Sequence, residues 1–148
     1  MEILRTGIIL NTENYKDCVA FYKEVFNLPI MFQETDGDFN LTCFDFDGAY
    51  LMIETGGVAQ SKGKSMEQSS TKLRFNVPDI EAAQEKLRSH DIEAVIEKNS
   101  WGSTINIYDP DGNKIGIRDE LTFKSQIKNI PNQYCHLVVL FQFLKILN

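Results

Sequence analysis

The side chains best suited to bind or orient a small molecule fall on short segments in which apolar and polar residues alternate. Lys72 and Arg74 are two residues apart, and Arg118 ends a similar segment that begins at Lys114. Alternation at every second residue is typical of a strand with one buried face, so these cations should share the opposite face. Together they could orient an anionic or carbonyl group; isolated surface charges, or pairs with Glu54, are the alternative.

The other candidate ligand-binding residues share this strand face or lie in a loop beside it. They are Asn11, Tyr50, Met52, Glu54, Asn106 and Tyr108 on the strands, and Trp101 in the loop. Apolar and aromatic groups with a few polar ones are typical of a small-molecule pocket. The alternatives are ordinary packing for the tyrosines, a hydrophobic plug for Trp101, and mutual pairing of Asn11 with Asn76. No residue is assigned a catalytic role.

The elements that would position these residues occur twice. Residues 43–54 and 107–118 align without gaps, with an Asp-x-Asp-Gly turn in register. Upstream of each, residues 7–22 and 72–87 form a second similar pair at nearly the same spacing. Two segments that repeat together indicate duplication of a whole unit.

Each unit begins with an alternating segment and then changes to helical spacing, with Asn14 and Asp79 as expected N-caps. A further strand, at residues 29–34 or 93–98, and the Asp-x-Asp-Gly hairpin complete the unit. The sequence therefore predicts an α+β domain over residues 1–120, with βαβββ modules at 1–57 and 70–120. Residues 55–70, rich in Gly, Ser and Gln, are expected to form a mobile linker that could also cover the cleft.

This order of elements resembles the vicinal oxygen chelate superfamily, which includes glyoxalase I, bleomycin-resistance proteins, fosfomycin-resistance enzymes and extradiol dioxygenases. The resemblance rests on "YKDCVAFYKEVFNLPI" (Tyr15–Ile30) and "YDPDGNKIGI" (Tyr108–Ile117), and it covers roughly residues 4 to 119. It implies a curled mixed sheet around a cleft, and a homodimer as in many relatives.

Metal-dependent members of that superfamily carry ligands at four strand positions, and the resemblance places these on Gly7, Met52, Lys72 and Gly116. Glycine has no side chain, lysine is cationic at neutral pH, and a thioether is a poor ligand for hard ions. The chain has two histidines, His90 and His136, and neither falls on a predicted cleft strand. We therefore predict no metal site and no other cofactor.

Composition excludes several classes of partner. The chain of 148 residues has 15 Lys and Arg against 21 Asp and Glu, so general binding to nucleic acid or anionic membranes is disfavoured. Three separated cysteines and the lack of a signal peptide favour the cytoplasm. Residues 121–148 form a C-terminal extension whose apolar part, Leu137–Leu147, is too short to span a membrane. We expect it to follow a polar linker, Lys124–Gln133, and to pack on a second subunit, or alternatively on its own domain.

These observations favour a metal-free small-molecule-binding protein that resembles the bleomycin-resistance branch and sequesters an anionic or carbonyl-bearing ligand. A metal-dependent lyase, isomerase or dioxygenase with an altered metal site is the second hypothesis. The third is an interaction protein whose cleft is vestigial. The missing ligands favour the binder over the enzyme, and the polar groups of the strand face favour it over a vestigial cleft.

Overall fold

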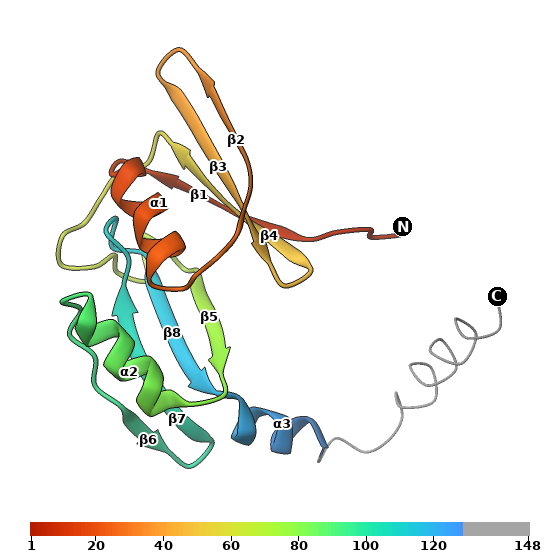
Figure 1. Cartoon of the computed structure of the whole chain (residues 1–148), viewed down its shortest axis with the longest axis vertical. Helices are drawn as coiled ribbons and strands as arrows, with labels where there is room; N and C mark the ends of the chain where they lie inside the picture. The colour runs from red at the N-terminus through yellow and green to blue at the C-terminus, as the bar shows by residue number, and fades with distance from the viewer. Residues whose placement is uncertain (129–148) are drawn as a thin grey trace.

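The computed structural model describes residues 1–128, and within them it confirms the predicted α+β fold of two βαβββ modules (Figure 1). The first module consists of β1 (Gly7–Thr12), α1 (Tyr15–Glu24), β2 (Ile30–Asp36), β3 (Phe39–Phe46) and β4 (Ala49–Thr55). The second consists of β5 (Lys72–Val77), α2 (Ile80–Ser89), β6 (Glu97–Asn99), β7 (Gly102–Tyr108) and β8 (Lys114–Asp119). A short helix, α3 (Glu120–Lys128), follows.

Each module folds its four strands into its own sheet, and the two sheets have the same topology. Their strand orders are β1-β4-β3-β2 and β5-β8-β7-β6, and the first strand of each module lies parallel to the last. The register is equivalent as well, since Ile8 lies opposite Leu51 in the first sheet and Leu73 opposite Ile115 in the second. The sequence repeat therefore corresponds to a repeat of the backbone.

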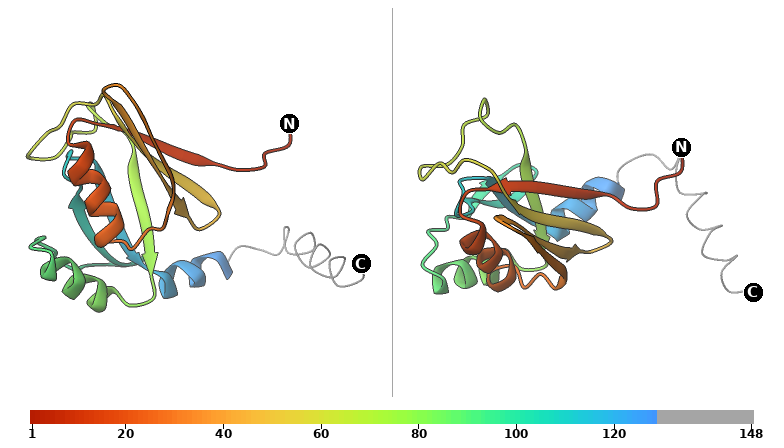
Figure 2. Two further views of the ribbon diagram at one scale, coloured as in Figure 1. Left: turned by 45° about the horizontal axis from the view of Figure 1, so that its top comes forward. Right: turned by 90° about the horizontal axis from the view of Figure 1, so that it is seen from above.

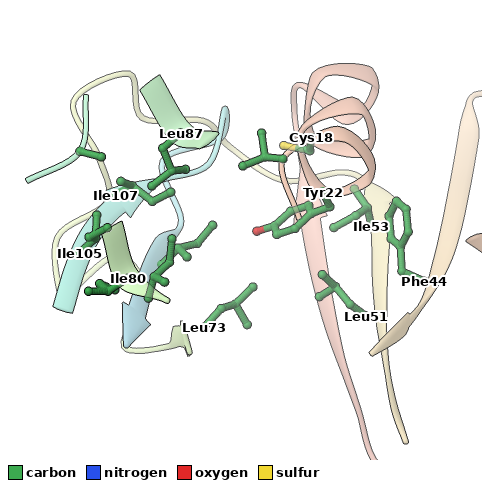
Figure 3. Close-up of a cluster of buried hydrophobic side chains, with 14 residues drawn as sticks. Cys18, Tyr22, Phe44, Leu51, Ile53, Leu73, Ile80, Leu87, Ile105 and Ile107 are labelled. Carbon is green, nitrogen blue, oxygen red and sulfur yellow. The ribbon is translucent and has the colours of Figure 1, made fainter. Parts of the chain in front are cut away.

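One hydrophobic core joins the two modules, and α1 lies within it between the two sheets (Figure 3). Cys18 and Tyr22 of α1 are fully buried. Leu51 and Ile53 pack on one side of this helix, and the second sheet contributes Leu73 and its neighbours on the other side. Because the apolar faces of both sheets line one core, the opposite face of each sheet lies on the side away from that core.

The two N-caps differ from one another. Asp79 caps α2 as predicted, since its side chain accepts a hydrogen bond from the Ala82 amide at 2.9 Å. Asn14 precedes α1, but its side chain makes no capping hydrogen bond. Asn14 therefore holds the predicted N-cap position, but its side chain donates to Asp111 Oδ1 at 3.2 Å and joins the two modules.

The two Asp-x-Asp-Gly hairpins also differ, although their sequences align. In the first, Asp47 and Gly48 alone connect β3 to β4, both with positive φ, which is the geometry of a tight two-residue turn. In the second, five residues (109–113) connect β7 to β8, and the buried Asp109 Oδ1 accepts from the amides of Asp111 and Asn113 at 3.0 and 2.8 Å. One sequence motif therefore makes two different turns.

The second turn is a junction between the modules. Asp111 is fully buried and accepts from the amides of Glu13 and Asn14 at 3.1 and 2.8 Å. Tyr22 donates its hydroxyl proton to Asp109 Oδ2 at 2.9 Å. Burial and the Asp109 carboxylate raise the pKa of Tyr22, so this hydroxyl stays protonated and keeps donating.

Residues 55–70 were expected to be a mobile linker, and the structure instead packs their central part on the second turn. The Gln60 amide donates to Asp111 O at 3.1 Å, and the Lys64 amide donates to Gly112 O at 2.8 Å. Lys64 Nζ lies 2.8 Å from Asn113 Oδ1. The polar composition of this segment reflects specific hydrogen bonds with the opposite module, which composition alone does not reveal.

Two further boundaries differ from the sequence expectations. The strand predicted at 93–98 is confined to β6, Glu97–Asn99, because Ala94 packs into the core and Gln84 donates to its carbonyl at 2.9 Å. The predicted polar linker Lys124–Gln133 begins as the second half of α3. The apolar segment Leu137–Leu147 lies outside the described residues. Within residues 1–128, no helix is both long and apolar enough to cross a membrane.

Candidate functional site

The structure divides the predicted site residues between two outward faces. Those of the first sheet, here called the first open face, are Asn11, Tyr50, Met52 and Glu54. Those of the second sheet, the second open face, are Lys72, Arg74, Asn106, Tyr108 and Arg118, with Trp101 in the turn beside them. The two groups of residues therefore come from different sheets, one from each module.

The first open face combines apolar side chains with one hydrogen-bonded pair of an amide and a carboxylate. Ile9 is 51% exposed, and the Tyr50 ring lies over Gly7, where an added Cβ would meet the ring at 2.1 Å. Asn11 Nδ2 donates to Glu54 Oε2 at 3.3 Å, so this carboxylate contacts an amide rather than a cation. The expected pairing of Asn11 with Asn76 is not observed.

The second open face collects positive charge around a glycine. A Cβ added at Gly116 would lie 2.8 Å from Lys72 Cε and 2.9 Å from Arg74 Cζ, so both side chains lie directly over this residue. Lys72 Nζ donates to Asn106 Oδ1, and Asn106 Nδ2 donates to Glu97 Oε2 at 3.0 Å. Any larger residue at position 116 would displace the two cations.

Burial and the proximity of other cations lower the pKa values of Lys72 and Arg74. Burial lowers the pKa of Lys72, the charges of Arg74 and Lys114 lower it further, and Glu97 opposes them. Burial and the neighbouring Arg118 guanidinium lower the pKa of Arg74. Repulsion between like charges is unfavourable in the free protein, and a bound anion would relieve it.

A pocket of about 660 Å³ opens where the second open face meets the first module. Phe46 and Leu28 line it from the first module, and Phe75 and Phe123 line it from the second. Its polar lining consists of Arg74, Asn76, Arg118, Asp47 and Glu120. We call this space the aromatic pocket; its lining combines apolar walls with five polar side chains, four of them charged.

Arg118 is fixed at the back of the aromatic pocket and is only 9% exposed. Its Nη2 donates to Trp101 O at 2.6 Å and to Gln126 Oε1 at 2.8 Å, while its guanidinium carbon lies 4.9 Å from the Trp101 ring centroid and 5.1 Å from that of Phe123. Its buried Nε has no hydrogen-bond partner among the described residues. Trp101 therefore holds an arginine by cation–π contact, a role that the sequence did not suggest.

The acidic residues of the aromatic pocket are partly neutralised by neighbours. Glu120 Oε2 accepts from Asn76 Nδ2 at 2.8 Å, and Glu120 Oε1 lies 3.6 Å from Lys124 Nζ. Asp47 is exposed in the β3–β4 turn. Arg74 and Arg118 therefore share the pocket with two carboxylates, of which Glu120 is hydrogen-bonded and Asp47 makes no salt bridge within residues 1–128.

Sequence reasoning missed the pocket residues that come from outside the repeat-matched strand face. Leu28 follows α1, Phe46 ends β3, and Phe123 belongs to α3. Apolar residues in such positions give no signal that distinguishes a pocket wall from ordinary core.

A second pocket, of about 310 Å³, lies between α1 and α2, which run side by side in both views of Figure 2. Its lining is mainly apolar, and the Asp79 carboxylate within it already caps α2. It lacks the convergent polar groups that would orient a ligand, so we regard the aromatic pocket as the candidate site.

Comparison with protein-family models identifies the chain. The model described as the glyoxalase-like domain matches residues 6–122. The chain belongs to this family. The glyoxalase-like domain lies within the vicinal oxygen chelate superfamily, as the Tyr15–Ile30 and Tyr108–Ile117 segments predicted. No curated protein is significantly similar to the chain in sequence.

Solved structures share the fold of this glyoxalase-like domain at low sequence identity. The trypanothione-dependent glyoxalase I of Leishmania major is 16% identical, with a TM-score of 0.66 over 86% of this chain and 93% of that one. The fosfomycin resistance protein FosX of Listeria monocytogenes is 16% identical, with a TM-score of 0.63 over 76% of this chain and 90% of that one. A glyoxylase/bleomycin resistance protein/dioxygenase domain from Frankia is 10% identical, with a TM-score of 0.62 over 80% and 91%.

The residues of this glyoxalase-like domain do not fit the metal site that its superfamily implies. The Tyr50 ring fills the space beside Gly7, and the Lys72 and Arg74 side chains fill the space beside Gly116. Within residues 1–128, no group of three or more His, Cys, Asp or Glu side chains is placed to hold a metal ion. Two cations over Gly116 would repel a divalent metal at that position.

Proposed function

We propose that this glyoxalase-like domain is a metal-free binding protein for a small anionic molecule, similar in role to the bleomycin-resistance branch of its superfamily. The observation that carries the proposal is the aromatic pocket, where Arg74 and Arg118 face apolar walls of Leu28, Phe46 and Phe123. Two guanidinium groups suit a carboxylate or another oxyanion, and the apolar walls suit the body of the ligand. We infer no turnover. The cytoplasmic location stays a prediction.

Arg74 is the residue that should control binding. Arg118 already donates hydrogen bonds to Trp101 and Gln126. The Arg74 side chain, in contrast, makes no hydrogen bond to another residue within 1–128. A carboxylate in the aromatic pocket would therefore take its strongest hydrogen bond from Arg74, with Arg118 supplying charge behind it.

Replacing Arg74 by Ala should weaken binding of octanoate, a carboxylate with an apolar tail, by about 1.5 to 3 kcal/mol, the range for a charge-assisted hydrogen bond. Isothermal titration calorimetry would measure the change. The substitution also relieves repulsion with Arg118, so the melting temperature of the free variant should not fall. Lys98→Gln, an exposed cation on the other face of the second sheet, is the matched control and should bind octanoate normally.

Equal affinity in the Arg74 variant and the parent protein would reject the cationic pocket. Absence of any carboxylate binding to the parent protein would favour the third hypothesis, an interaction protein with a vestigial cleft.

A metal-dependent enzyme remains the second candidate, because a structural neighbour, the fosfomycin resistance protein, was solved with Mn(II). The identities of Gly7, Met52, Lys72 and Gly116 oppose it for this chain. We predict that purified protein contains no stoichiometric Ni, Zn, Fe or Mn. Elemental analysis that finds about one metal per chain, with an activity that a chelator abolishes, would establish the enzyme instead.

We also propose that the protein acts as a homodimer. Every residue of β2 is exposed, including Ile30, Met31 and Phe32, and the β2–β3 hairpin projects from the first module (Figure 1). Exposed apolar strands of this kind are usually covered by a partner. A second copy could place its first open face opposite the second open face of this chain.

The sequence of the C-terminal extension supports the same proposal, because Leu137–Leu147 contains too many apolar residues to leave in water. We expect the full chain to have the mass of a dimer in sedimentation or light scattering, and removal of residues 130–148 to weaken that dimer. A monomeric full chain would contradict the dimer. A truncated chain that dimerises as tightly would show that the open faces, rather than the extension, hold it together.

A further inference from the structure

The second open face contains a smaller pocket beside the aromatic pocket, and its lining is also cationic. This pocket, of about 250 Å³, is lined by Lys72, Asn106, Ile107, Tyr108, Lys114 and Ile115. We call it the lysine pocket. Lys72 and Lys114 lie opposite each other in the register of β5 and β8, so their side chains leave the sheet side by side.

The charges around the lysine pocket are not balanced by the protein. Glu97 is the carboxylate nearest this pair in the hydrogen-bond network, and its Oε2 accepts from Asn106 Nδ2 at 3.0 Å. No salt bridge joins Lys72 or Lys114 to an acidic residue within residues 1–128. Two opposed like charges on neighbouring strands are unfavourable, which indicates that the face is built for a negative partner.

The two pockets lie in line along the same pair of strands. Arg74 and Arg118, which line the aromatic pocket, are two and four residues further along β5 and β8 than Lys72 and Lys114. At the rise of a strand, this places the backbones of the two pairs roughly 7 to 13 Å apart, while the Lys72 and Arg74 side chains lean toward each other over Gly116. Gly116 lies between the pairs, and the Lys72 and Arg74 side chains occupy the space that a side chain at this position would take.

We infer that the ligand is an elongated dianion, with one anionic group between Arg74 and Arg118 and the other between Lys72 and Lys114. This inference rests on the proposed function, since it places the first anionic group in the aromatic pocket. Tyr108, which is 48% exposed at the rim of the lysine pocket, can donate its hydroxyl proton to the second group. A monoanion would leave the lysine pair uncompensated.

The test compares suberate with octanoate, which have the same chain length but two carboxylates and one. Calorimetry on the full chain should show suberate binding at least about tenfold more tightly, because one additional charge-assisted contact exceeds that factor. In the double variant Lys72→Gln/Lys114→Gln, suberate should fall to the affinity of octanoate, and octanoate should be little changed. The control is Lys16→Gln/Lys98→Gln, which removes two exposed cations elsewhere and should keep the preference.

The outcomes test the dianion inference separately from the proposed anion-binding function on which it rests. Equal binding of suberate and octanoate to the parent protein would overturn the dianion while leaving the anion-binding function intact. A preference for suberate that survives in the Lys72/Lys114 variant would also overturn it, since the second group would then bind elsewhere. If neither compound bound, both the dianion inference and the proposed anion-binding function would be contradicted. Thermal unfolding of each variant, compared with the parent, shows that the differences do not come from misfolding.

Discussion

Replacing Asp111 by Asn should lower the free energy of unfolding by about 3 kcal/mol, the largest effect we expect from a single polar substitution. Asp111 is fully buried, accepts from the amides of Glu13 and Asn14, and lies 3.7 Å from Lys64 Nζ. The side-chain NH2 of an asparagine would point at one of the two backbone amides, which also donate. Lys64 would lose its negatively charged partner. Urea denaturation followed by circular dichroism would measure the loss.

The internal repeat supplies a matched control for this substitution. Asp47 occupies the same motif position in the first hairpin, yet it is exposed and makes no salt bridge within residues 1–128. Asp47→Asn should therefore change the free energy of unfolding by no more than about 0.5 kcal/mol. Similar losses at the two positions would show that the buried junction contributes nothing specific.

Replacing Gly112 by Ala should destabilise the protein by about 2 to 4 kcal/mol. The residue has φ of +80°, and an added Cβ would lie 2.3 Å from Gln60 O, a backbone atom that cannot rotate away. The contact exists because the segment around Gln60 and Lys64 is hydrogen-bonded to this turn. We expect the alanine to push that segment off the second module as well as to strain the turn.

Gly48→Ala separates the two contributions. Gly48 occupies the matching turn position with φ of +90°, and nothing lies within 4 Å of an added Cβ. Its substitution should lower the free energy of unfolding only through the strain of alanine in a left-handed backbone conformation, by about 1 to 2 kcal/mol. If the two alanine variants lost equal stability in urea denaturation, the segment around Gln60 would not be held against the second turn in solution.

The aligned pairs Asp47/Asp111 and Gly48/Gly112 show how much of the repeat could be interpreted from the sequence. The alignment of residues 43–54 with 107–118 correctly predicted two modules of the same topology, because strand alternation and helical spacing are local properties. It also suggested two similar turns, and there it was wrong. Asp47 and Asp111 align, but only Asp111 is buried and hydrogen-bonded to the backbone of the other module.

The candidate site was predictable in the same partial way. Period-two alternation placed Lys72, Arg74 and Arg118 on one face of one sheet, as the register of β5 and β8 shows. It could not show how the face that carries Asn11 and Glu54 lies relative to them, because the orientation of each sheet depends on the shared core. Nor could it show Phe46 and Phe123 as pocket walls, since these come from different parts of the chain.

The sequence by itself determined the elements, their duplication, the family and the absence of ordinary ligand residues at Gly7, Met52, Lys72 and Gly116. Each of these depends on residue identity and on spacing within a short segment. Only the tertiary structure decided which aligned aspartate is buried, what holds the segment around Gln60, and that the cations of the second open face border two pockets. These features depend on contacts between residues far apart in sequence, and local periodicity carries no information about such contacts.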